Sequence, residues 1–600
     1  MFKNHPKGLL VAFFSNMGER FGFYTMMAIL VLFLQAKYGL TEAQAGGYYS
    51  WFYFGIYALA LIGGIIADAT RKYKFVILLG IIIMFGGYVV MAFPGNPLAI
   101  TLVGLFTIAL GNGLFKGNLQ AVVGQMYDNP QYSKVRDTAF MIFYMGINIG
   151  AFFAPFVANG IRNWFLQSQG YLHDGSLPAM CHAFNNGTLD DVAKFQELAN
   201  HVSGKTVADL GAFATEYISV FANGYNYAFG IAAGAMVLSL LVYIIFNKFL
   251  PTVGKVVKAE NKDGAKTNTM SFLLAAGLML TTSVIFYFLM NDVALGAAVG
   301  LFVGFVAMML QISTKEERPR VSSLILVFFV VIFFWMSFHQ NGLTMTFFAR
   351  DYTVKEVAPF TYLFFSLYPL LSFIGAVAGI VLLFNKAKTL KLAGVAMTLV
   401  FGALVWFFMS GFESSNPIAP EVFQSFNPLF IVALTFPVMG VFTWLRSKNM
   451  EPSTPRKIGI GMVIAAVGFV VILVGSIGLV SPHELQFIEN GVTKYNPVPD
   501  SSRVVPYWLI SSYLVLTIAE LFLSPMGLSF VSKVAPPRFQ GLMQGGWLLA
   551  TAVGNKFLFV GSDFWGKLDL WQLWAIFVVC CLLSAVFIFS IMKRLETVTK

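Results

Sequence analysis

Two full charges interrupt the first long apolar segment of the chain, in the stretch Phe13-Phe14-Ser15-Asn16-Met17-Gly18-Glu19-Arg20-Phe21-Gly22-Phe23-Tyr24. A charge near the centre of a membrane-spanning helix costs about 2.5–3.5 kcal/mol, and it is retained where it faces a partner or a water-filled cavity. At 3.6 residues per turn, one stripe of this helix carries Asn16, Glu19, Arg20, Phe23, Tyr24 and Met27. The pattern predicts a spanning helix whose polar stripe lines a solute pathway. The alternative is a structural ion pair that joins two helices.

The composition is that of a chain with many membrane-spanning segments. Of its 600 residues, 58% are hydrophobic and 11% are charged, and the apolar residues come in runs of about 20 or more. The three cysteines, Cys181 and the adjacent Cys580 and Cys581, have neither the number nor the spacing of a disulfide framework or a metal site. The six histidines do not cluster with acids or nucleophiles. We therefore expect no metal, no cofactor and no enzymatic activity.

Sixteen apolar segments are long enough to span a bilayer as helices. They cover approximately residues 8–36, 44–68, 73–93, 98–127, 137–163, 219–247, 269–290, 293–312, 321–348, 358–384, 390–413, 422–446, 457–480, 505–532, 539–562 and 569–592. An even number of spans places both termini on one side, and that side carries 27 Lys and Arg residues against nine on the other. The positive-inside rule therefore predicts cytoplasmic termini, and the distribution explains the net charge of +11 without a nucleic-acid partner.

Few polar residues lie within these spans. Besides the pair in the first span, they include Lys116, Asn148, His339, Gln340, Asn427 and Glu520. The two acids and two bases among all of these would cost on the order of 10 kcal/mol together if each stayed unpaired in hydrocarbon. Because their signs balance, we expect them to share one central cavity, lined also by Tyr24, Tyr57 and Trp547. Lys556 lies near the outer end of its span, and its long side chain is expected to reach the bilayer surface.

Three segments lie outside the expected spans. Residues 164–218 form a polar insertion on the outer side, where Thr188 is expected to cap a helix that ends near Gly204. The apolar stripe of that helix consists of Val192, Phe195, Leu198, Ala199 and Val202. Such a stripe favours a cap packed on the outer face over a separate domain. Residues 248–268 are rich in lysine and typical of a linker, and residues 481–504 form a second outer loop.

Four further motifs accompany the charged stretch of the first span. They are Gly63–Asp68 followed by Arg71-Lys72, Gly111–Asn118, Phe143–Ala151 and Glu520–Ser529. The first stretch is similar to the motif E-x-x-E-R-F-x-Y-Y, and all five stand in the order found in proton-dependent oligopeptide transporters. The chain therefore resembles this family, a branch of the major facilitator superfamily, over most of its length.

The resemblance implies an all-α polytopic membrane protein with the major facilitator fold, in which two six-helix bundles alternate access at their interface. Residues 1–250 would form the N-terminal bundle with the outer insertion 164–218, and residues 321–600 the C-terminal bundle. Residues 251–320 would hold a cytoplasmic linker and the two extra helices of bacterial members. A further hairpin at about residues 358–413 departs from the usual fourteen helices and gives about 16. We favour a lipid-facing role for it over a partner site.

Two substitutions separate this chain from the family's usual proton relay. Asn16 stands in place of the first acid of the motif, and His339 stands where an acid usually precedes the glutamine of the seventh core helix. Glu19 and Glu520 remain as membrane-embedded carboxylates, and a carboxylate that exchanges Arg20 for a proton is a workable coupling device. His339 either titrates near neutral pH or is an uncharged wall residue, and both interpretations stay open here.

We expect a secondary transporter that imports di- and tripeptides by proton symport across the bacterial inner membrane and works as a monomer. A short peptide is a zwitterion, so Arg20 and Lys116 suit its carboxylate, and Glu520 suits its ammonium. The expected substrate-binding residues are Arg20, Tyr24, Tyr57, Lys116, Asn148, Gln340, Asn427, Glu520 and Trp547. The expected proton-coupling residues are Glu19, Arg20, Lys116, His339 and Glu520.

An uncoupled or atypically coupled transporter of peptide-like or anionic solutes is the alternative. It follows from the two substitutions of usual acids, at Asn16 and His339. A membrane-embedded enzyme or a receptor that does not transport is disfavoured, because the sequence has no clustered nucleophile and base at helical spacing.

Overall fold

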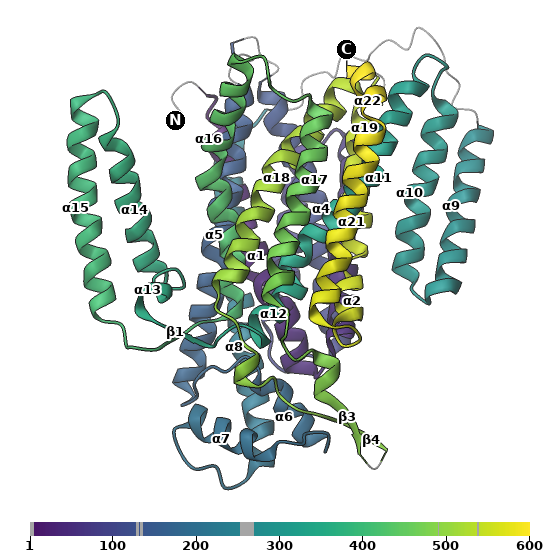
Figure 1. The fold of residues 1–600 in the computed structure, drawn as a ribbon. Coiled ribbons are helices and arrows are strands. Elements are labelled where there is room, and N and C mark those ends of the chain that lie inside the picture. The colour runs from purple at the N-terminus through teal and green to yellow at the C-terminus, as the bar shows by residue number, and fades with distance from the viewer. Residues whose placement is uncertain are drawn as a thin grey trace.

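Long helices run side by side through the molecule and form one membrane-spanning layer (Figure 1). The computed structural model describes residues 5–127, 131–132, 136–251, 269–489, 491–536 and 539–599. Fourteen helices in these ranges are long and apolar enough to cross a bilayer. The start of α1 (Gly8–Tyr38) and helix α22 (Met592–Thr599) lie at one end of the layer, the terminal end. The opposite end, which carries α6 (Leu177–Asn185) and α7 (Val192–Ser203), is the cap end.

The first helix group comes from the first part of the chain. Its members are α1, α2 (Glu42–Thr70), α3 (Tyr73–Ala92), α4 (Leu98–Met126), α5 (Arg136–Ser168) and α8 (Leu210–Phe246), which the turn η2 (Asn247–Phe249) follows. α1 packs against α5 and α8, α3 packs against α4 and α8, and α2 packs against α4. The charged stretch does not break α1, because Glu19 and Arg20 are turned into this group and are buried.

The second helix group comes from the last part of the chain. Its members are α11 (Arg318–Phe338) with η3 (His339–Gly342) and α12 (Thr344–Asp351), α16 (Phe426–Ser447), α17 (Thr454–Gly475), α18 (Tyr507–Val534), α19 (Gln540–Lys556), α20 (Phe559–Trp565) and α21 (Leu570–Ser590). α17 packs against α18 and α21, and α11 packs against α19 and α21. The 3₁₀ turn η3 interrupts the α-helix at the sequence His339-Gln340, so these two side chains project from a local break in the helix.

Two helical hairpins stand at the sides of these groups (Figure 1). In one, α9 (Thr269–Met290) packs against α10 (Val293–Ile312), which also packs against α11 and α19. In the other, α14 (Leu367–Leu383) packs against α15 (Lys388–Ser410), and the pair stands apart from the second helix group (Figure 1). A Cβ added at Gly379 would lie 2.9 Å from the carbonyl oxygen of Gly394, so the two backbones meet closely where only glycine fits.

All sixteen expected spans contain helix. α14 and α19 have 17 residues each, and they are the two expected spans that are absent from the fourteen helices selected by length. The expected linker of residues 248–268 lies mostly outside the described residues, which stop at 251 and resume at 269.

The expected insertion of residues 164–218 is shorter than predicted, because residues 164–168 continue α5 and residues 210–218 begin α8. Between them, α6 and α7 pack as a cap on α8. Its second helix begins after Asp191, whose carboxylate accepts a hydrogen bond from the Lys194 N–H at 2.8 Å, and ends at Gly204 with φ +64°. The prediction that Thr188 caps this helix is therefore wrong, because an aspartate closer to its first turn takes that place. The predicted end at Gly204 is confirmed.

Short strands complete the cap end. The antiparallel pairs are β1 (Glu356–Val357) with β2 (Asn416–Pro417), and β3 (Gln486–Glu489) with β4 (Val492–Tyr495). The remaining short helices are α13 (Pro359–Tyr362), η4 (Pro420–Ser425), η5 (Pro482–Leu485) and η6 (Asp500–Ser502). The backbone of Tyr495 donates to Thr188 O at 2.8 Å, so the outer loop of the second group pairs with the insertion of the first.

Candidate functional site

The two charged residues of α1, Glu19 and Arg20, form an ion pair with each other in this conformation. The Arg20 guanidinium donates to both carboxylate oxygens of Glu19, at 2.5 and 2.6 Å, and also lies 4.6 Å from the centre of the Phe23 ring. The Asn112 amide of α4 donates to Glu19 at 2.7 Å. Glu19 and Arg20 are 0% and 3% exposed, so this bidentate contact is a buried, hydrogen-bonded ion pair. Their charges neutralise each other, so neither residue is a counter-ion for another charge in the interior.

Lys116 of α4 is an unpaired cation. Its Nζ lies 4.3 Å from the centre of the Tyr57 ring on α2, which is a cation–π contact. Within the described ranges, its ammonium makes no ion pair and no hydrogen bond. An ammonium at this depth is expensive without an anion, so Lys116 is available to bind one.

Glu520 of α18 is the matching unpaired anion. Its side chain is 8% exposed, and one oxygen accepts a hydrogen bond at 3.0 Å from the amide of Asn427 on α16. The same amide donates to Thr517 at 3.0 Å, which fixes its direction. No cation in the described part of the chain lies within ion-pair distance of Glu520. The carboxylate therefore remains available to a positively charged group.

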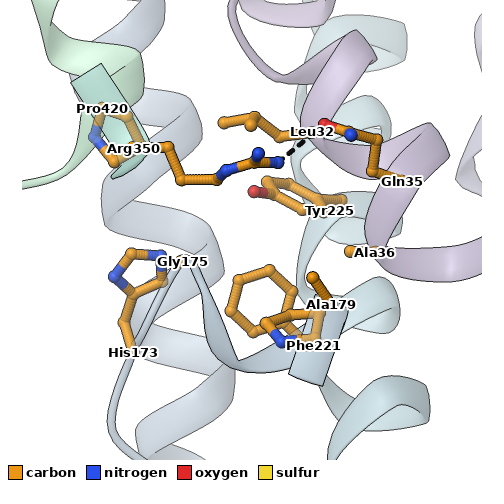
Figure 2. Close-up of a pocket in the computed structure, with 11 residues that line it drawn as sticks. Leu32, Gln35, Ala36, His173, Gly175, Ala179, Phe221, Tyr225, Arg350 and Pro420 are labelled. Carbon is orange, nitrogen blue, oxygen red and sulfur yellow. Dashed lines mark hydrogen bonds between the residues drawn. The ribbon is translucent and has the colours of Figure 1, made fainter. Parts of the chain in front are cut away.

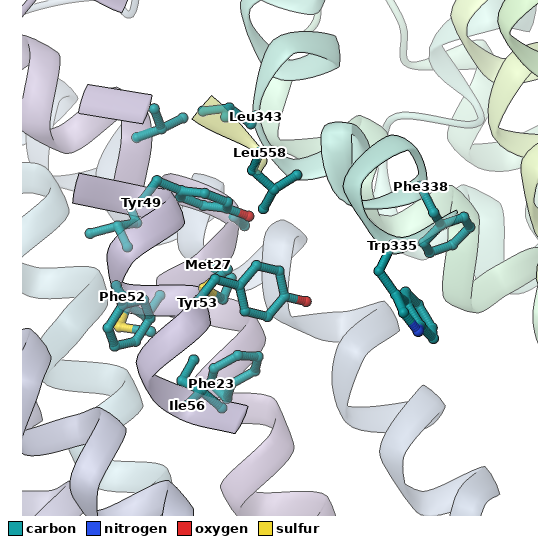
Figure 3. Packing of buried hydrophobic residues seen from close by; sticks show 14 of the residues in the cluster. Phe23, Met27, Tyr49, Phe52, Tyr53, Ile56, Trp335, Phe338, Leu343 and Leu558 are labelled. Atoms are coloured by element: carbon teal, nitrogen blue, oxygen red, sulfur yellow. The ribbon is translucent and has the colours of Figure 1, made fainter. Parts of the chain in front are cut away.

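Aromatic rings from both helix groups meet in the interior of the protein. The His339 ring lies 4.7 Å from the ring of Tyr53 on α2 and stacks on Trp335 of α11 at 4.6 Å. Figure 3 shows Tyr53 and Trp335 on facing helices of the two groups. Nδ1 of His339 lies 2.5 Å from Oδ1 of Asn555 on α19. His339 is 7% exposed, so it is a buried member of this aromatic stack, and its polar partner is Asn555.

The other expected site residues lie nearby but differ in availability. Gln340 is fully buried, and its amide donates to Met336 O and Leu558 O at 3.1 Å each, so its hydrogen-bonding capacity is spent within the protein. Trp547 packs so tightly on α18 that a Cβ added at Gly527 would lie 1.8 Å from its ring. Both residues hold helices together in this conformation.

Two of the expected site residues, Asn148 and Tyr24, keep more freedom, as does Asn16 of the first motif. The Asn148 amide donates to the carbonyl of its own helix, at Tyr144, at 3.1 Å. Tyr24 is half-buried and stands edge-on to Phe23 at 5.3 Å. The amide nitrogen of Asn16, which replaces an acid in the motif, is buried without a hydrogen-bond partner. The polar stripe of α1 therefore keeps one free donor beside its closed ion pair.

The cap end is closed by contacts between the two helix groups. Arg162 of α5 and Glu421 of η4, both 0% exposed, form an ion pair, and the Tyr225 hydroxyl donates to the same Glu421 oxygen at 3.0 Å. Arg162 stands at the end of the expected span 137–163, and because α5 continues to Ser168, the structure buries its side chain inside the protein. A buried arginine needs a partner, and Glu421 supplies it.

A second set of contacts lies farther toward the cap. The Arg350 guanidinium donates to Gln35 at 2.7 Å and to Glu42 at 3.0 Å, and the cavity beside it measures about 20 Å³ (Figure 2). A space of this size holds about one water molecule, so no peptide passes here. Lys355 binds Asp174 at 2.5 Å. Burial acts to raise the pKa of Asp174, but Lys355 and Ser176 hold that pKa below its ordinary value.

Lys556 is the charged residue that the sequence placed wrongly. Its side chain does not extend to the molecular surface but is 2% exposed, and its Nζ lies 2.5 Å from Asp292 in the turn between α9 and α10. Asn112, Tyr53 and Asn555 were missed as site residues. Asn112 stands within the glycine-rich motif of α4, which was a usable signal, whereas nothing local in the sequence marks Tyr53 or Asn555.

These features define a class of protein. A multi-pass membrane protein with unpaired charges of opposite sign on two helix groups, and with closure at one end, has the construction of a solute transporter. The model of the POT family matches residues 74–371 and 408–565, and the chain belongs to this family.

Relatives of this chain include peptide transporters. The chain is 27% identical over 566 residues to the peptide transporter YePEPT of Yersinia enterocolitica, which covers 92% of this chain and 87% of the relative. It is 25% identical over 550 residues to dipeptide and tripeptide permease A of Chromobacterium violaceum, covering 92% and 83%. Like these homologues, the chain is a transporter and not an enzyme.

Solved structures share the fold. A peptide transporter POT variant in complex with alafosfalin has a TM-score of 0.65 at 24% identity, covering 100% of this chain and 97% of that one. A POT family transporter in complex with 5-aminolevulinic acid has a TM-score of 0.64 at 22% identity, covering 100% and 98%. These likenesses establish the all-α polytopic membrane fold that the sequence predicted.

Proposed function

We propose that this protein imports di- and tripeptides across the bacterial inner membrane by proton symport. In this proposal the chain divides at residues 1–250, 251–320 and 321–600, and the first and last parts act as bundles that open alternately to the two sides. The excess of Lys and Arg on the terminal side supports cytoplasmic termini. The names of the relatives, which are peptide transporters and permeases, support the substrate class.

The observation that carries the proposal is the pair of unpaired charges. Lys116 belongs to the first helix group and Glu520 to the second, and each lacks a counter-ion among the described residues. A peptide has one carboxylate and one ammonium, so it neutralises both charges at once. Binding then draws the two groups together, which is the coupling between substrate and conformation that alternating access requires.

Each end of the peptide has further partners. Asn427 keeps one oxygen of Glu520 oriented, and the other oxygen receives the ammonium. Arg20 becomes a second cation for the carboxylate when Glu19 takes up a proton and releases it. We assign proton coupling to this exchange and to protonation of Glu520 itself.

Uptake into proteoliposomes tests the proposal. Purified protein is reconstituted, and accumulation of a labelled dipeptide is followed with and without an inward proton gradient. We expect uptake above the equilibrium level only with the gradient. Absence of uptake under both conditions contradicts the proposal.

An uncoupled transporter is the second candidate. Two observations favour it. The Glu19 carboxylate already accepts hydrogen bonds from Arg20 and Asn112, and the uncharged Asn16 stands where the motif usually has an acid. Internal pH on addition of substrate separates the candidates, because only symport acidifies the lumen. Restoring acids with Asn16→Glu and His339→Asp is expected to strengthen proton dependence if the relay has merely been lost.

A further inference from the structure

A continuous row of side chains connects the two helix groups across the interior. Lys116 lies 4.3 Å from the Tyr57 ring, Tyr57 lies 5.9 Å from Tyr53, Tyr53 lies 4.7 Å from His339, and His339 stacks on Trp335 at 4.6 Å. We call these five residues the donor wall. The wall includes one cation and no carboxylate.

Two buried N–H groups at the far end of the wall lack acceptors. The indole nitrogen of Trp335 and the amide nitrogen of Asn555 are both buried, and neither has a hydrogen-bond partner in the described part of the chain. Trp335 is 8% exposed and Asn555 is 0% exposed, and the oxygen of Asn555 is already engaged by His339. Unsatisfied donors in a buried site destabilise it, so the wall favours a ligand group that accepts hydrogen bonds.

The interior is electrically asymmetric. The charge of Glu19 is neutralised by Arg20, and Asn112 donates a hydrogen bond to the same carboxylate, so Glu19 does not offset the charge of the wall. The unpaired acid, Glu520, lies on α18 and is oriented by Asn427 on α16, two helices that contribute nothing to the wall. The wall itself therefore attracts anions and hydrogen-bond acceptors, and the group that attracts cations, Glu520, is not part of it.

We infer that the donor wall is a side-chain subsite that selects peptides with an acidic C-terminal residue, an inference that rests on the proposed peptide transport. When the peptide carboxylate binds Lys116, the side chain of the same residue lies against the wall. An acidic side chain there is attracted by the one cation of the wall and extends toward the unpartnered donors at its far end. An acidic N-terminal residue instead lies near Glu520 and is repelled.

A pair of sequence isomers tests the inference without any variant. Ala-Glu and Glu-Ala have the same composition and net charge, and each competes with a labelled neutral dipeptide for uptake by the wild-type protein. A hydrogen bond to a charged group justifies an expected preference of about tenfold for Ala-Glu. Ala-Gln, which accepts hydrogen bonds without the charge, is expected between the two.

Variants of the wall locate the preference. Trp335→Phe keeps the ring and removes the N–H, so the advantage of Ala-Glu over Ala-Gln is expected to shrink. His339→Glu places a carboxylate in the wall and is expected to reverse the order, so that Ala-Lys competes better than Ala-Glu. Trp574→Phe is the matched control, because the Trp574 indole donates to Ser476 at 3.0 Å away from this site. Its peptide ratios should equal those of the wild type.

The outcomes separate this inference from the proposed function. If dipeptides are taken up but Ala-Glu and Glu-Ala compete equally, the wall is not a side-chain subsite, and peptide transport stands. If the preference exists but both wall variants leave it unchanged, the assignment to the wall is overturned. If no dipeptide is taken up or competes, the proposed function fails, and the inference fails with it.

Discussion

At the scale of single residues, Glu520 is the group on which peptide recognition most depends. Glu520→Gln keeps the shape and removes the charge that binds the ammonium. Because a hydrogen bond between charged groups contributes about 1.5–3 kcal/mol, dipeptide affinity is expected to weaken by about one to two powers of ten. Competition assays on reconstituted protein measure this change. Glu413→Gln, on an exposed loop at the cap end, is the matched control and should change nothing.

An N-acetylated dipeptide completes this experiment. It lacks the ammonium, so it should bind the wild type poorly and lose little further affinity on Glu520→Gln. The four affinities form a double cycle that isolates the contact between the two charges. Equal losses for the free and the acetylated peptide would mean that Glu520 acts in protonation or closure and does not recognise the amino terminus.

Residue types alone predicted four of the charges that lie inside the helix layer, but they predicted neither the partners of these charges nor the burial of Lys556 and Glu421. Glu19, Arg20, Lys116 and Glu520 stand out because hydrocarbon tolerates few charges. Asn112 donates a hydrogen bond to Glu19, whereas Lys116 has no anionic partner among the described residues. This difference depends on how α1 and α4 face each other. The contact between His339 and Asn555 joins residues 216 positions apart, and no local pattern encodes such a distance.

At the scale of elements, the α9–α10 hairpin provides a counter-ion to the second helix group. Asp292→Asn leaves the Lys556 ammonium buried without an anion, so the variant should be clearly less stable. Lys556→Met removes the buried charge and leaves Asp292, which is 32% exposed, free to be hydrated. We therefore expect an asymmetric result: Asp292→Asn lowers the apparent Tm much more than Lys556→Met does.

Thermal denaturation of the purified variants measures this asymmetry. The double variant Asp292→Asn with Lys556→Met should recover most of the lost stability, because no unpaired charge remains. Lys194→Gln breaks a surface pair with Glu197 and is the control, expected to cost about 0–1 kcal/mol. Equal effects of the two single variants would show that the pair is effectively solvated.

At the scale of the whole molecule, the buried pair of Arg162 and Glu421 holds the cap end shut. Breaking a buried pair by removing one partner costs about 3–5 kcal/mol, so Glu421→Gln should move the population toward a conformation open at the cap end. Spin labels are placed at the exposed positions Gln169 and Ile477 after the native cysteines have been removed. Pulsed electron paramagnetic resonance then measures the distance between the two helix groups.

We expect a longer distance to gain population in Glu421→Gln, and the short distance to return when Arg162→Met is added. Mild acid alone should not have this effect through Asp174. Because the pKa of Asp174 lies below its ordinary value, its ion pair with Lys355 is complete above that ordinary value and is lost only as the pH falls well below it. Unchanged distances in Glu421→Gln would place the closing contact elsewhere.

The sequence predicts the layer of helices well because hydropathy acts locally, and every expected span contains helix. The contacts that close the cap end were not predictable in the same way. Arg162 stands at the end of its expected span and Glu421 precedes its span by one residue, so nothing local marks either as part of a buried ion pair. Their contact exists because two helix groups meet in space, and a single sequence carries no direct signal for that meeting.

The α14–α15 hairpin has a consequence for how such chains change length. The family match stops at residue 371 and resumes at 408, which leaves out most of this hairpin. Its two helices bury their small residues against each other, at Gly379 and Gly394, so the pair carries its own packing. A coding segment for such a pair can be gained or lost without refitting its neighbours. Because the chain leaves and re-enters the bilayer on one side, everything translated after the insertion keeps its original orientation.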